Sequence, residues 1–313
     1  MKNSKNLIDV VVPIYNEEDN LQLFIDRTEK VLNKIGTFKI IFCLDPSTDK
    51  SEKIITENIK KNTNLAYIKF SRRFGQPSAI MAGIHSSNSR YLVVIDADMQ
   101  DPPELILDLY KKINQGFDVV LAKRSSRDGE SIIKLIVSFF GYRIINFLSN
   151  IKIENDVGDF RIMSERVVKE LKKIDEPDPF LRGLVSYVGF KETSLLYSRS
   201  QRYSGSGKYN RFFGSYKIGV NGIFSFSSKL LTYILFLGLF IFVTSTLLIF
   251  LILILFFFDS LKFPMGYTSI ILGILFFGGI QLIAIGILGE YIGRVFDTVK
   301  KRPNYIIEKK VNI

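Results

Sequence analysis

Two aspartates, Asp96 and Asp98, stand two positions apart directly after a short apolar run at 92–95. The run is rich in β-branched residues and predicts a strand buried on both faces, as in a parallel sheet. Side chains at i and i+2 of an extended chain point to the same side, so the two carboxylates would lie together. A hard cation, Mg²⁺ or Mn²⁺, usually binds such a pair when a phosphate is also present.

The same aspartates also fit an acidic surface turn that Pro102 and Pro103 would close. An Asp-x-Asp motif alone does not separate the two interpretations. The carboxyl end of a parallel strand is where open α/β sheets bind their ligands, so the surrounding elements decide between them.

The first part of the chain alternates apolar runs typical of strands with segments of helical spacing, joined by short connections. This alternation predicts a doubly wound α/β sheet. The expected strands are 7–14, 38–44, 65–70, 92–95 and 118–122, and the expected helices are 20–35, 51–61, 77–87 and 104–115.

Several common site types are absent from this sequence. Pro13-Ile14-Tyr15-Asn16 stands where a dinucleotide fold needs its glycine motif, and there is no Walker loop. The only histidine is His85 and the only cysteine is Cys43, so neither a zinc cluster nor an internal disulfide can form. We expect both side chains to be structural.

Two long uncharged runs, 230–258 and 263–289, lie in the last third of the chain. About 20 apolar residues suffice for a helix to cross the hydrocarbon core, so each run predicts a transmembrane helix. Basic residues flank the pair on both outer sides, and the positive-inside rule therefore puts both ends in the cytoplasm. Buried core helices are the alternative, which the length of both runs disfavours.

The segment 131–150 is apolar but carries Lys134 and Arg143, which are too costly for a membrane crossing. It predicts an amphipathic helix lying at the headgroups, with a core helix as the alternative. The net charge of +11 and the basic flanks favour phosphates and a membrane surface as partners. No nucleic-acid-binding motif is present. The N-terminus lacks the pattern of a signal peptide, so we expect it to stay in the cytoplasm.

Three stretches of this sequence resemble the polyprenyl-phosphate glycosyltransferases, the bactoprenol glucosyltransferase and dolichol-phosphate mannose synthase branch of the family 2 GT-A enzymes. Others, including 183–190, 278–294 and 300–306, are similar to the bactoprenol subgroup. The three stretches are Val11-Val12-Pro13-Ile14-Tyr15-Asn16-Glu17-Glu18, Asp96-Ala97-Asp98-Met99-Gln100-Asp101-Pro102-Pro103 and Val157-Gly158-Asp159-Phe160-Arg161-Ile162-Met163-Ser164.

The resemblance implies a role for each matching residue. It implies a catalytic carboxylate at Asp159, and metal and diphosphate binding by Asp96 and Asp98. The residues implied to bind the donor nucleotide and its sugar are Pro13, Tyr15, Glu17, Asp45, Asp96 and Gln100. Many relatives have two polar residues and a glycine where this chain has Leu44-Asp45-Pro46, so the nucleobase stays open.

Two basic segments are candidates for binding the acceptor phosphate, because arginine binds phosphate bidentately and lysine binds it as a point charge. We expect Arg124, Arg202 and Lys208 to take part directly in the reaction. Binding of anionic lipid is the alternative for the other charges. The full acceptor set is Arg124, Arg127, Lys134, Arg202 and Lys208.

The resemblance implies an inverting, metal-dependent transfer of a hexose from a nucleotide sugar, with a UDP-sugar such as UDP-glucose favoured, to polyprenyl phosphate at the cytoplasmic leaflet. The enzyme would sit in a bacterial inner membrane and could form a homo-oligomer. The expected parts are a GT-A catalytic domain over 1–210, a juxtamembrane segment over 211–229, a transmembrane hairpin over 230–292 and a basic cytoplasmic tail over 293–313.

Three alternatives remain open from the sequence. The first is a GDP-mannose-using enzyme similar to dolichol-phosphate mannose synthase. The second is a processive polysaccharide synthase, which the absence of Trp and the small number of spans disfavour. The third is a catalytically silent membrane scaffold, which the intact Asp96, Asp98, Asp159 and Arg202 disfavour.

Overall fold

The computed structural model describes residues 6–125, 154, 157–176, 179–198 and 267–313, together with isolated positions between 233 and 254. The described residues form two compact units. The first unit extends to position 198 and also contains 302–313, whereas the second holds the described positions between 233 and 301.

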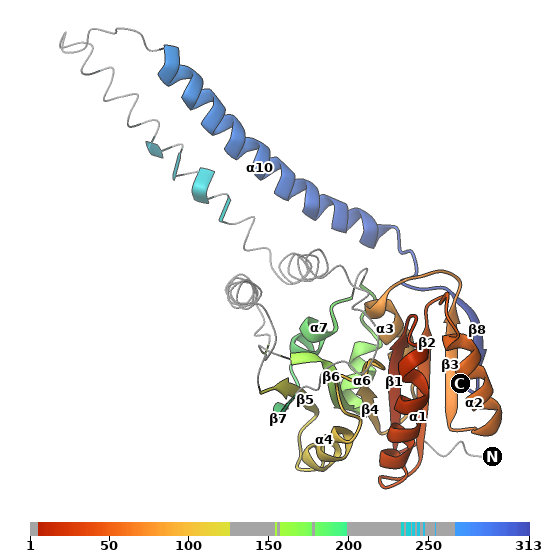
Figure 1. The fold of residues 1–313 in the computed structure, drawn as a ribbon. Helices are drawn as coiled ribbons and strands as arrows, with labels where there is room; N and C mark the ends of the chain where they lie inside the picture. The colour runs from red at the N-terminus through yellow and green to blue at the C-terminus, as the bar shows by residue number, and fades with distance from the viewer. Residues whose placement is uncertain are drawn as a thin grey trace. The chain divides into compact units, whose positions relative to one another are not determined.

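One mixed sheet of eight strands, in the order β7-β5-β6-β4-β1-β2-β3-β8, forms the centre of the first unit (Figure 1). Strands β1 to β4 are parallel to their neighbours within that set, whereas β6 and β8 run antiparallel to theirs. The strands are β1 (Ile8–Ile14), β2 (Phe38–Leu44), β3 (Leu65–Phe70), β4 (Tyr91–Val94), β5 (Val119–Arg124), β6 (Val157–Ser164), β7 (Glu192–Tyr197) and β8 (Ile307–Val311).

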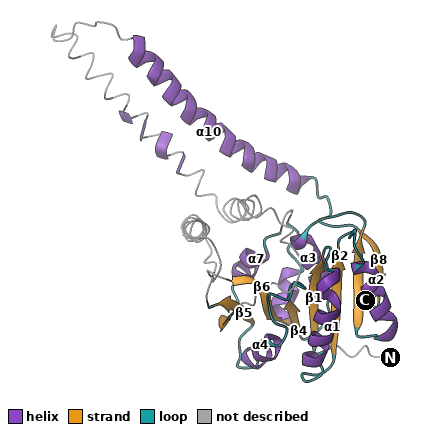
Figure 2. Ribbon diagram, in the orientation of Figure 1, coloured by secondary structure: helices purple, strands orange, loops and turns teal. Residues whose placement is uncertain are grey.

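Helices pack on both faces of this sheet (Figure 2), because alternate side chains of each strand point to opposite sides. Val10 and Val12 of β1 join the core cluster that contains Phe24, whereas Val11 lies beneath Gly83 on the other face. The helices of the first unit are α1 (Glu18–Leu32), α2 (Ser51–Lys61), α3 (Gln76–Ser86), α4 (Leu105–Ile113), α6 (Glu165–Leu171) and α7 (Leu181–Val188).

Strands β1 and β4 lie side by side at the centre of the sheet although β2 and β3 come between them in the sequence. The chain therefore changes direction across the sheet between β3 and β4. A crevice for ligands is expected at the carboxyl ends of the two strands that flank such a switch point. Asp96 follows the end of β4 there, and Tyr15 follows the end of β1.

The C-terminal segment, expected from the sequence to be a tail over 293–313, contributes a strand to the sheet of the first unit. Strand β8 pairs with β3 as the edge strand, and the Tyr305 hydroxyl lies 2.9 Å from Nδ1 of His85 in α3. Asn304 donates 3.0 Å to Asp175, so side-chain contacts also attach this segment to the first unit.

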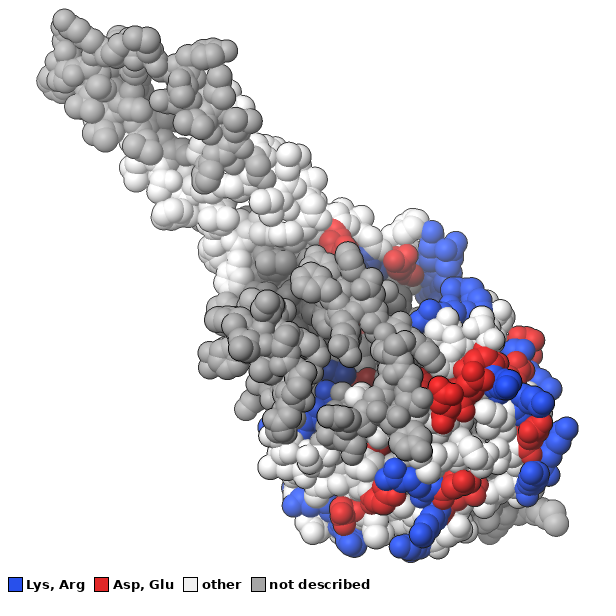
Figure 3. Space-filling model, viewed as in Figure 1, with Lys and Arg blue, Asp and Glu red and all other residues white. Residues whose placement is uncertain are grey.

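The second unit contains the long helix α10 (Tyr267–Val299). Its described side chains are largely exposed and apolar, and Figure 3 shows few charges on it compared with the mixed charges on the first unit. In the part of the chain that the structure describes, no helix combines the length and hydropathy needed to cross a membrane. Most of 230–258 and all of 131–150 lie outside the described residues.

The α/β architecture predicted from the sequence is confirmed, and each of the nine strands and helices expected up to residue 122 is present with small changes at its ends. The sheet is mixed rather than wholly parallel, because β6 and β8 run against their neighbours. The long connection between β5 and β6 was not recognised as leading back into the same sheet.

Gly83 provides a test of how closely α3 packs on the sheet. A Cβ atom at this position would lie 2.3 Å from Cγ1 of Val11 and 3.0 Å from Sγ of Cys43. Alanine gains about 1 kcal/mol in helix propensity, but overpacking of a core costs about 1–3 kcal/mol. We therefore expect Gly83→Ala to lower the thermal unfolding midpoint of the first unit. Gly293→Ala in α10, where a Cβ meets nothing within 4 Å, is the matched control and should leave that midpoint unchanged.

Candidate active site

Two loops at the carboxyl ends of β1 and β2 are joined by reciprocal hydrogen bonds. The amide of Asn16 donates 3.1 Å to Oγ of Ser47, and the amide of Thr48 donates 2.8 Å to Oδ1 of Asn16. Asn16 has a φ of 54°, a left-handed conformation that asparagine tolerates better than most residues. These bonds fix the chain beside Tyr15, whose ring lies 3.8 Å from the guanidinium carbon of Arg73.

Asp45, at the end of β2, fixes the loop that leads into α3. Its Oδ1 and Oδ2 accept the backbone N–H groups of Phe74 and Gly75, both at 2.9 Å, and the residue is buried. Gly75 has a φ of 91°, which favours glycine, and Pro77 fits the first turn of the helix. Asp45 therefore holds the start of α3 in place; its predicted contact with the nucleoside stays a prediction.

The turn that follows β4 carries the two aspartates. The backbone N–H of Gln100 donates 3.1 Å to Oδ1 of Asp98, which closes the turn. Met99, between them, is buried with a φ of 61°, and a non-glycine residue held in this conformation is strained. Such strain is concentrated at functional sites, because the surrounding structure must enforce it.

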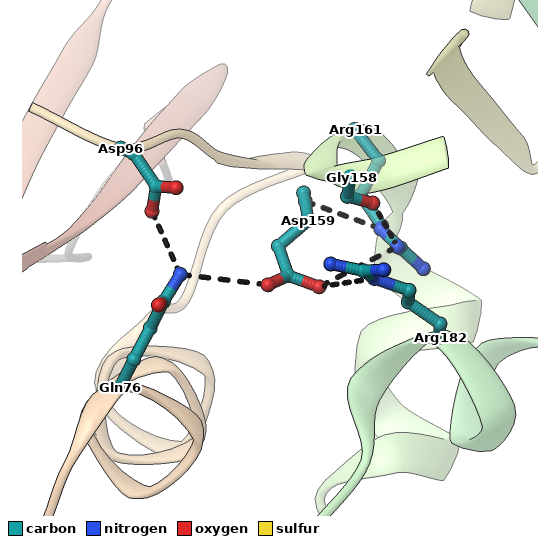
Figure 4. Close-up of polar contacts among 6 residues, drawn as sticks. All are labelled: Gln76, Asp96, Gly158, Asp159, Arg161 and Arg182. Atoms are coloured by element: carbon teal, nitrogen blue, oxygen red, sulfur yellow. Dashed lines mark hydrogen bonds and ion pairs between the residues drawn. The ribbon is translucent and has the colours of Figure 1, made fainter. Parts of the chain in front are cut away.

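Gln76 lies between the aspartate turn and β6. Its Nε2 donates 2.9 Å to Oδ1 of Asp96 and also lies 3.4 Å from Oδ2 of Asp159 (Figure 4). Asp159 belongs to β6, so this amide connects carboxylates that are 63 positions apart in the sequence. The sheet thus brings Asp96 and Asp159 to one place, although their spacing in the sequence does not predict it.

Two arginines face Asp159 on the side away from Gln76 (Figure 4). Nε of Arg182 donates 3.0 Å to Oδ1 of Asp159, and Nη2 of Arg161 lies 4.0 Å from the same oxygen. Arg161 is 1% exposed and also donates to the backbone oxygens of Gly158 and Asp159. Burial raises the pKa of the Asp159 carboxyl, but Arg182 and Arg161 lower it by more, so the net shift is downward. Asp159 is therefore a carboxylate at neutral pH and a weak base.

Arg124, at the end of β5, completes the group of cations around Asp159. A Cβ on Gly158 would lie 3.2 Å from Nη2 of Arg124, so the glycine leaves room for this guanidinium. Nε of Arg124 is buried and has no hydrogen-bond partner among the described residues. A buried donor in this state is costly, which is the property expected of a group that binds an anion.

A buried pair supports the aspartate turn from β7. The hydroxyl of Tyr197 donates to Oδ1 of Asp101, which is buried. Burial and the neighbouring Asp101 raise the pKa of the Tyr197 hydroxyl, so it stays protonated and remains a donor. The pair links the end of β7 to the loop that carries Asp96 and Asp98.

The predicted site residues fall into three groups. Asp96, Asp159 and Arg124 lie within one connected set of side chains, and Asp98 and Gln100 lie in the same turn as Asp96. Pro13, Tyr15, Glu17 and Asp45 lie at or after the ends of β1 and β2, which border it. Arg127, Lys134, Arg202 and Lys208 lie outside the described residues.

Sequence reasoning missed Gln76, Arg161 and Arg182. A single glutamine at a helix start has no chemical signature of its own, although Gly75 and Pro77 on either side indicate a fixed backbone there. Arg161 is in a strand that the sequence analysis did not predict. Arg182 lies at the start of the short helix α7, and only the fold brings it to Asp159.

Asp96 and Asp98 have the donor chemistry that Mg²⁺ and Mn²⁺ prefer, since both metals bind carboxylate oxygens. No group of three or more His, Cys, Asp or Glu able to hold a metal occurs among the described side chains. Mg²⁺ is usually held by one or two carboxylates together with substrate phosphates and water. The two aspartates therefore fit a metal that binds together with a phosphorylated substrate.

The sheet, its switch point and the carboxylates at the strand ends form an α/β fold of the GT-A type. Residues 9–172 match the family model described as glycosyl transferase family 2. A bactoprenol glucosyl transferase of Shigella phage SfII is 38% identical over 307 residues, which cover 96% of this chain and 97% of that protein. An uncharacterised glycosyltransferase of Synechocystis sp. is 38% identical over 305 residues, covering 96% of this chain and 94% of that protein.

The chain therefore belongs to glycosyl transferase family 2 and is a glycosyltransferase, related to the bactoprenol glucosyl transferases. The resemblance noted in the sequence is confirmed. A solved structure of glucosyl-3-phosphoglycerate synthase from Mycobacterium tuberculosis, in complex with Mn²⁺, UDP and phosphoglyceric acid, has a TM-score of 0.50. It is 15% identical, and the likeness covers 70% of this chain and 76% of that one. It supports the fold assignment.

The lowered pKa of Asp159 gives a testable pH dependence. Because its folded-state pKa lies below the ordinary value, the ionised carboxylate stabilises the fold above the pKa of the unfolded chain. This stabilisation is lost as the pH falls through the folded-state pKa. Arg182→Met removes the leading favourable charge and leaves the burial, so we expect the pKa of Asp159 to rise. Carbon-13 NMR of labelled aspartates, with Asp159 assigned through Asp159→Asn, measures the change.

Arg166 supplies the matched control for that experiment. It forms a bidentate ion pair with Asp118 at the opposite end of the sheet, and its hydrogen bond lowers the pKa of that carboxyl. Arg166→Met should raise the pKa of Asp118 and leave that of Asp159 unchanged. An unaltered Asp159 titration in Arg182→Met would contradict the assignment of Arg182 as its main ion-pair partner.

Proposed function

We propose that this enzyme transfers a hexose, with inversion, from a nucleotide sugar to polyprenyl phosphate at the cytoplasmic leaflet of a bacterial inner membrane. A UDP-sugar, UDP-glucose in particular, is the favoured donor, and undecaprenyl (bactoprenyl) phosphate is the favoured acceptor. The observation that carries the proposal is the meeting of Asp96, Asp98 and Asp159 with the arginines around them in a chain that resembles bactoprenol glucosyl transferases along its length.

The donor would lie over the carboxyl ends of β1, β2 and β4. Tyr15 with the neighbouring Arg73 offers an aromatic and a cationic surface to the nucleotide. Gln100 and Glu17 border this region and would contact the sugar and the nucleoside respectively. The diphosphate would then lie next to the aspartate turn, where its charge would grow as the glycosidic bond breaks.

Asp96 and Asp98 would hold Mg²⁺ or Mn²⁺, which supplies a Lewis acid that stabilises the leaving diphosphate. Asp96 keeps a fixed direction because Gln76 donates to it, and Asp98 does so because its Oδ1 closes the turn onto Gln100. The mycobacterial synthase, which was solved in complex with Mn²⁺ and UDP, supports this choice of ion.

The acceptor phosphate would bind at Arg124, whose buried Nε lacks a partner among the described residues. Arg127, Lys134, Arg202 and Lys208 are proposed to add to this site. The phosphate is already anionic near neutral pH, since the second pKa of a phosphate monoester is about 6. The weakly basic Asp159 is therefore proposed to position the reactants and hold Arg182 and Arg161 rather than to remove a proton.

Membrane anchoring by the second unit is the remaining part of the proposal, with 131–150 lying at the headgroups. The uncharged runs 230–258 and 263–289 support it. The chain leaves the first unit before these runs and re-enters it at 302–313, where β8 joins the sheet. Any segment that starts and ends in one folded domain must cross a bilayer an even number of times. A two-helix hairpin satisfies this condition.

A panel of labelled nucleotide sugars tests the proposal directly. Purified full-length enzyme, polyprenyl phosphate and Mg²⁺ or Mn²⁺ should give label that is extracted with lipid, most strongly with UDP-glucose. Stronger labelling with GDP-mannose would show that GDP-mannose, and not UDP-glucose, is the donor. Label found only in polymer would indicate a processive synthase, and the absence of transfer from every donor would refute the proposal.

Asp98→Asn tests the metal assignment within the same assay. The change removes one anionic ligand while keeping the size of the side chain, so we expect transfer to fall by at least about 100-fold. Metal-dependent binding of UDP, measured by calorimetry, should weaken in parallel. Asp108→Asn, on the exposed side of α4, is the control and should behave as the unmodified enzyme. Unchanged turnover in Asp98→Asn would show that Asp98 is not a ligand of the metal.

Arg124→Lys tests the acceptor site, because lysine keeps the charge but loses the bidentate donor geometry. Loss of one charge-assisted hydrogen bond costs about 1.5–3 kcal/mol, so KM for polyprenyl phosphate should rise by about 10–100-fold. The donor KM should change little. Arg90→Lys, at the opposite end of β4, is the control. A larger effect on the donor KM than on the acceptor KM would show that Arg124 binds the donor and not the acceptor.

A further inference from the structure

Gln76 is a polar side chain that contacts two carboxylates of the site, and only its contact with Asp96 enters the proposed function. Its Nε2 is 2.9 Å from Oδ1 of Asp96 and 3.4 Å from Oδ2 of Asp159. An ionised carboxylate only accepts hydrogen bonds, so the atom that faces both of them must be the NH₂ nitrogen. The two N–H groups of one amide can each serve one carboxylate.

The backbone of Gln76 is fixed more firmly than is usual for the start of a helix. The two preceding amides, of Phe74 and Gly75, are both held by Asp45, and Pro77 restricts the backbone on the other side. The helix itself packs closely on β1, where Gly83 leaves no room for a side chain. Because its backbone is held in this way, the Gln76 side chain sets the positions of the carboxylates that it contacts.

Electrostatics explain why a neutral donor suits this place. Two ionised carboxylates repel each other, and a lysine between them would neutralise one and compete with a cation for Asp96. An amide donates to both without adding a net charge. Asp96 keeps its full negative charge for a metal, and Asp159 keeps its own for Arg182 and Arg161.

We infer that Gln76 is a positioning residue of sugar transfer, whose amide sets the distance between Asp96 on the donor side and Asp159 beside the arginine cluster. The inference rests on the proposed function. The shorter contact fixes Gln76 to Asp96, and the longer contact transmits that position to Asp159. Hydrogen bonds that serve catalysis are often long before the substrate binds, as this second contact is.

Gln76→Leu and Gln76→Glu test the inference in the full-length enzyme. Leucine keeps much of the volume but removes both donors, so kcat should fall by about 10–100-fold, as is usual when a partner of a metal-binding group is lost. KM for both substrates should change less than kcat. Gln22→Leu, the same substitution at an exposed position of α1, is the control and should leave kcat unchanged.

The transfer rate of Gln76→Glu distinguishes a positioning role from a merely structural one. Glutamate keeps the length and shape of glutamine but puts a third carboxylate between Asp96 and Asp159, where it offers no N–H donor and repels both neighbours. The kcat of this variant should therefore fall at least as far as that of Gln76→Leu, whereas a side chain that only fills space would tolerate glutamate. Thermal unfolding midpoints within a few degrees of the unmodified enzyme establish that both variants fold.

A second measurement does not depend on turnover. Loss of a donor to an ionised carboxyl raises its pKa, so carbon-13 NMR of labelled aspartates should show a higher pKa for Asp159 in Gln76→Leu. The inference is overturned if that pKa is unchanged, or if Gln76→Leu keeps kcat within twofold while the unmodified enzyme transfers sugar. Failure of the proposed function looks different, since the unmodified enzyme would then transfer no sugar to lipid whatever the state of Gln76.

Discussion

The mutual repulsion of acidic side chains gathered at one edge of a sheet is the constraint on which the site depends. Asp45, Asp96, Asp98, Asp101 and Asp159 all lie at or near strand ends on that edge, and each has a donor directed at it. The groups that donate these hydrogen bonds differ in charge from one aspartate to the next. Backbone amides hold Asp45 and Asp98, a phenol holds Asp101, and an arginine holds Asp159. An anionic substrate can approach such an edge only where cations offset the acids, and Arg124, Arg161 and Arg182 do so beside Asp159.

These contacts link the ends of several strands to residues from other parts of the chain. Asp45 fixes the start of α3, α3 carries Gln76, and Gln76 reaches Asp96 and Asp159. A disturbance at the end of β2 would therefore reach the turn after β4 through three side chains. A donor bound over β1 and β2, as proposed, would be coupled to the carboxylates by these hydrogen bonds without a large movement.

Much of this architecture could be predicted from the sequence, because buried parallel strands leave near-continuous apolar runs and the helices between them leave a clear period. The runs at 38–44 and 65–70 correspond to β2 and β3 residue for residue. The Asp96 turn was also recognisable, since two acids after such a run are costly unless they bind something. Asp159 was identified only through a family resemblance. No local pattern links it to Asp96, and the antiparallel return of β6 that joins them follows a long connection. The roles of Gln76 and Arg182 depend wholly on that return.

The position of β8 has a consequence for how the protein is made. The edge of β3 that β8 covers is complete only when a segment that comes after the entire second unit has been synthesised. Until then β3 presents an open row of backbone groups, which is the feature of a sheet most prone to unwanted pairing. The ribosome therefore synthesises the apolar second unit before β8 can complete the sheet. A chain whose synthesis stops before β8 keeps this edge of β3 exposed.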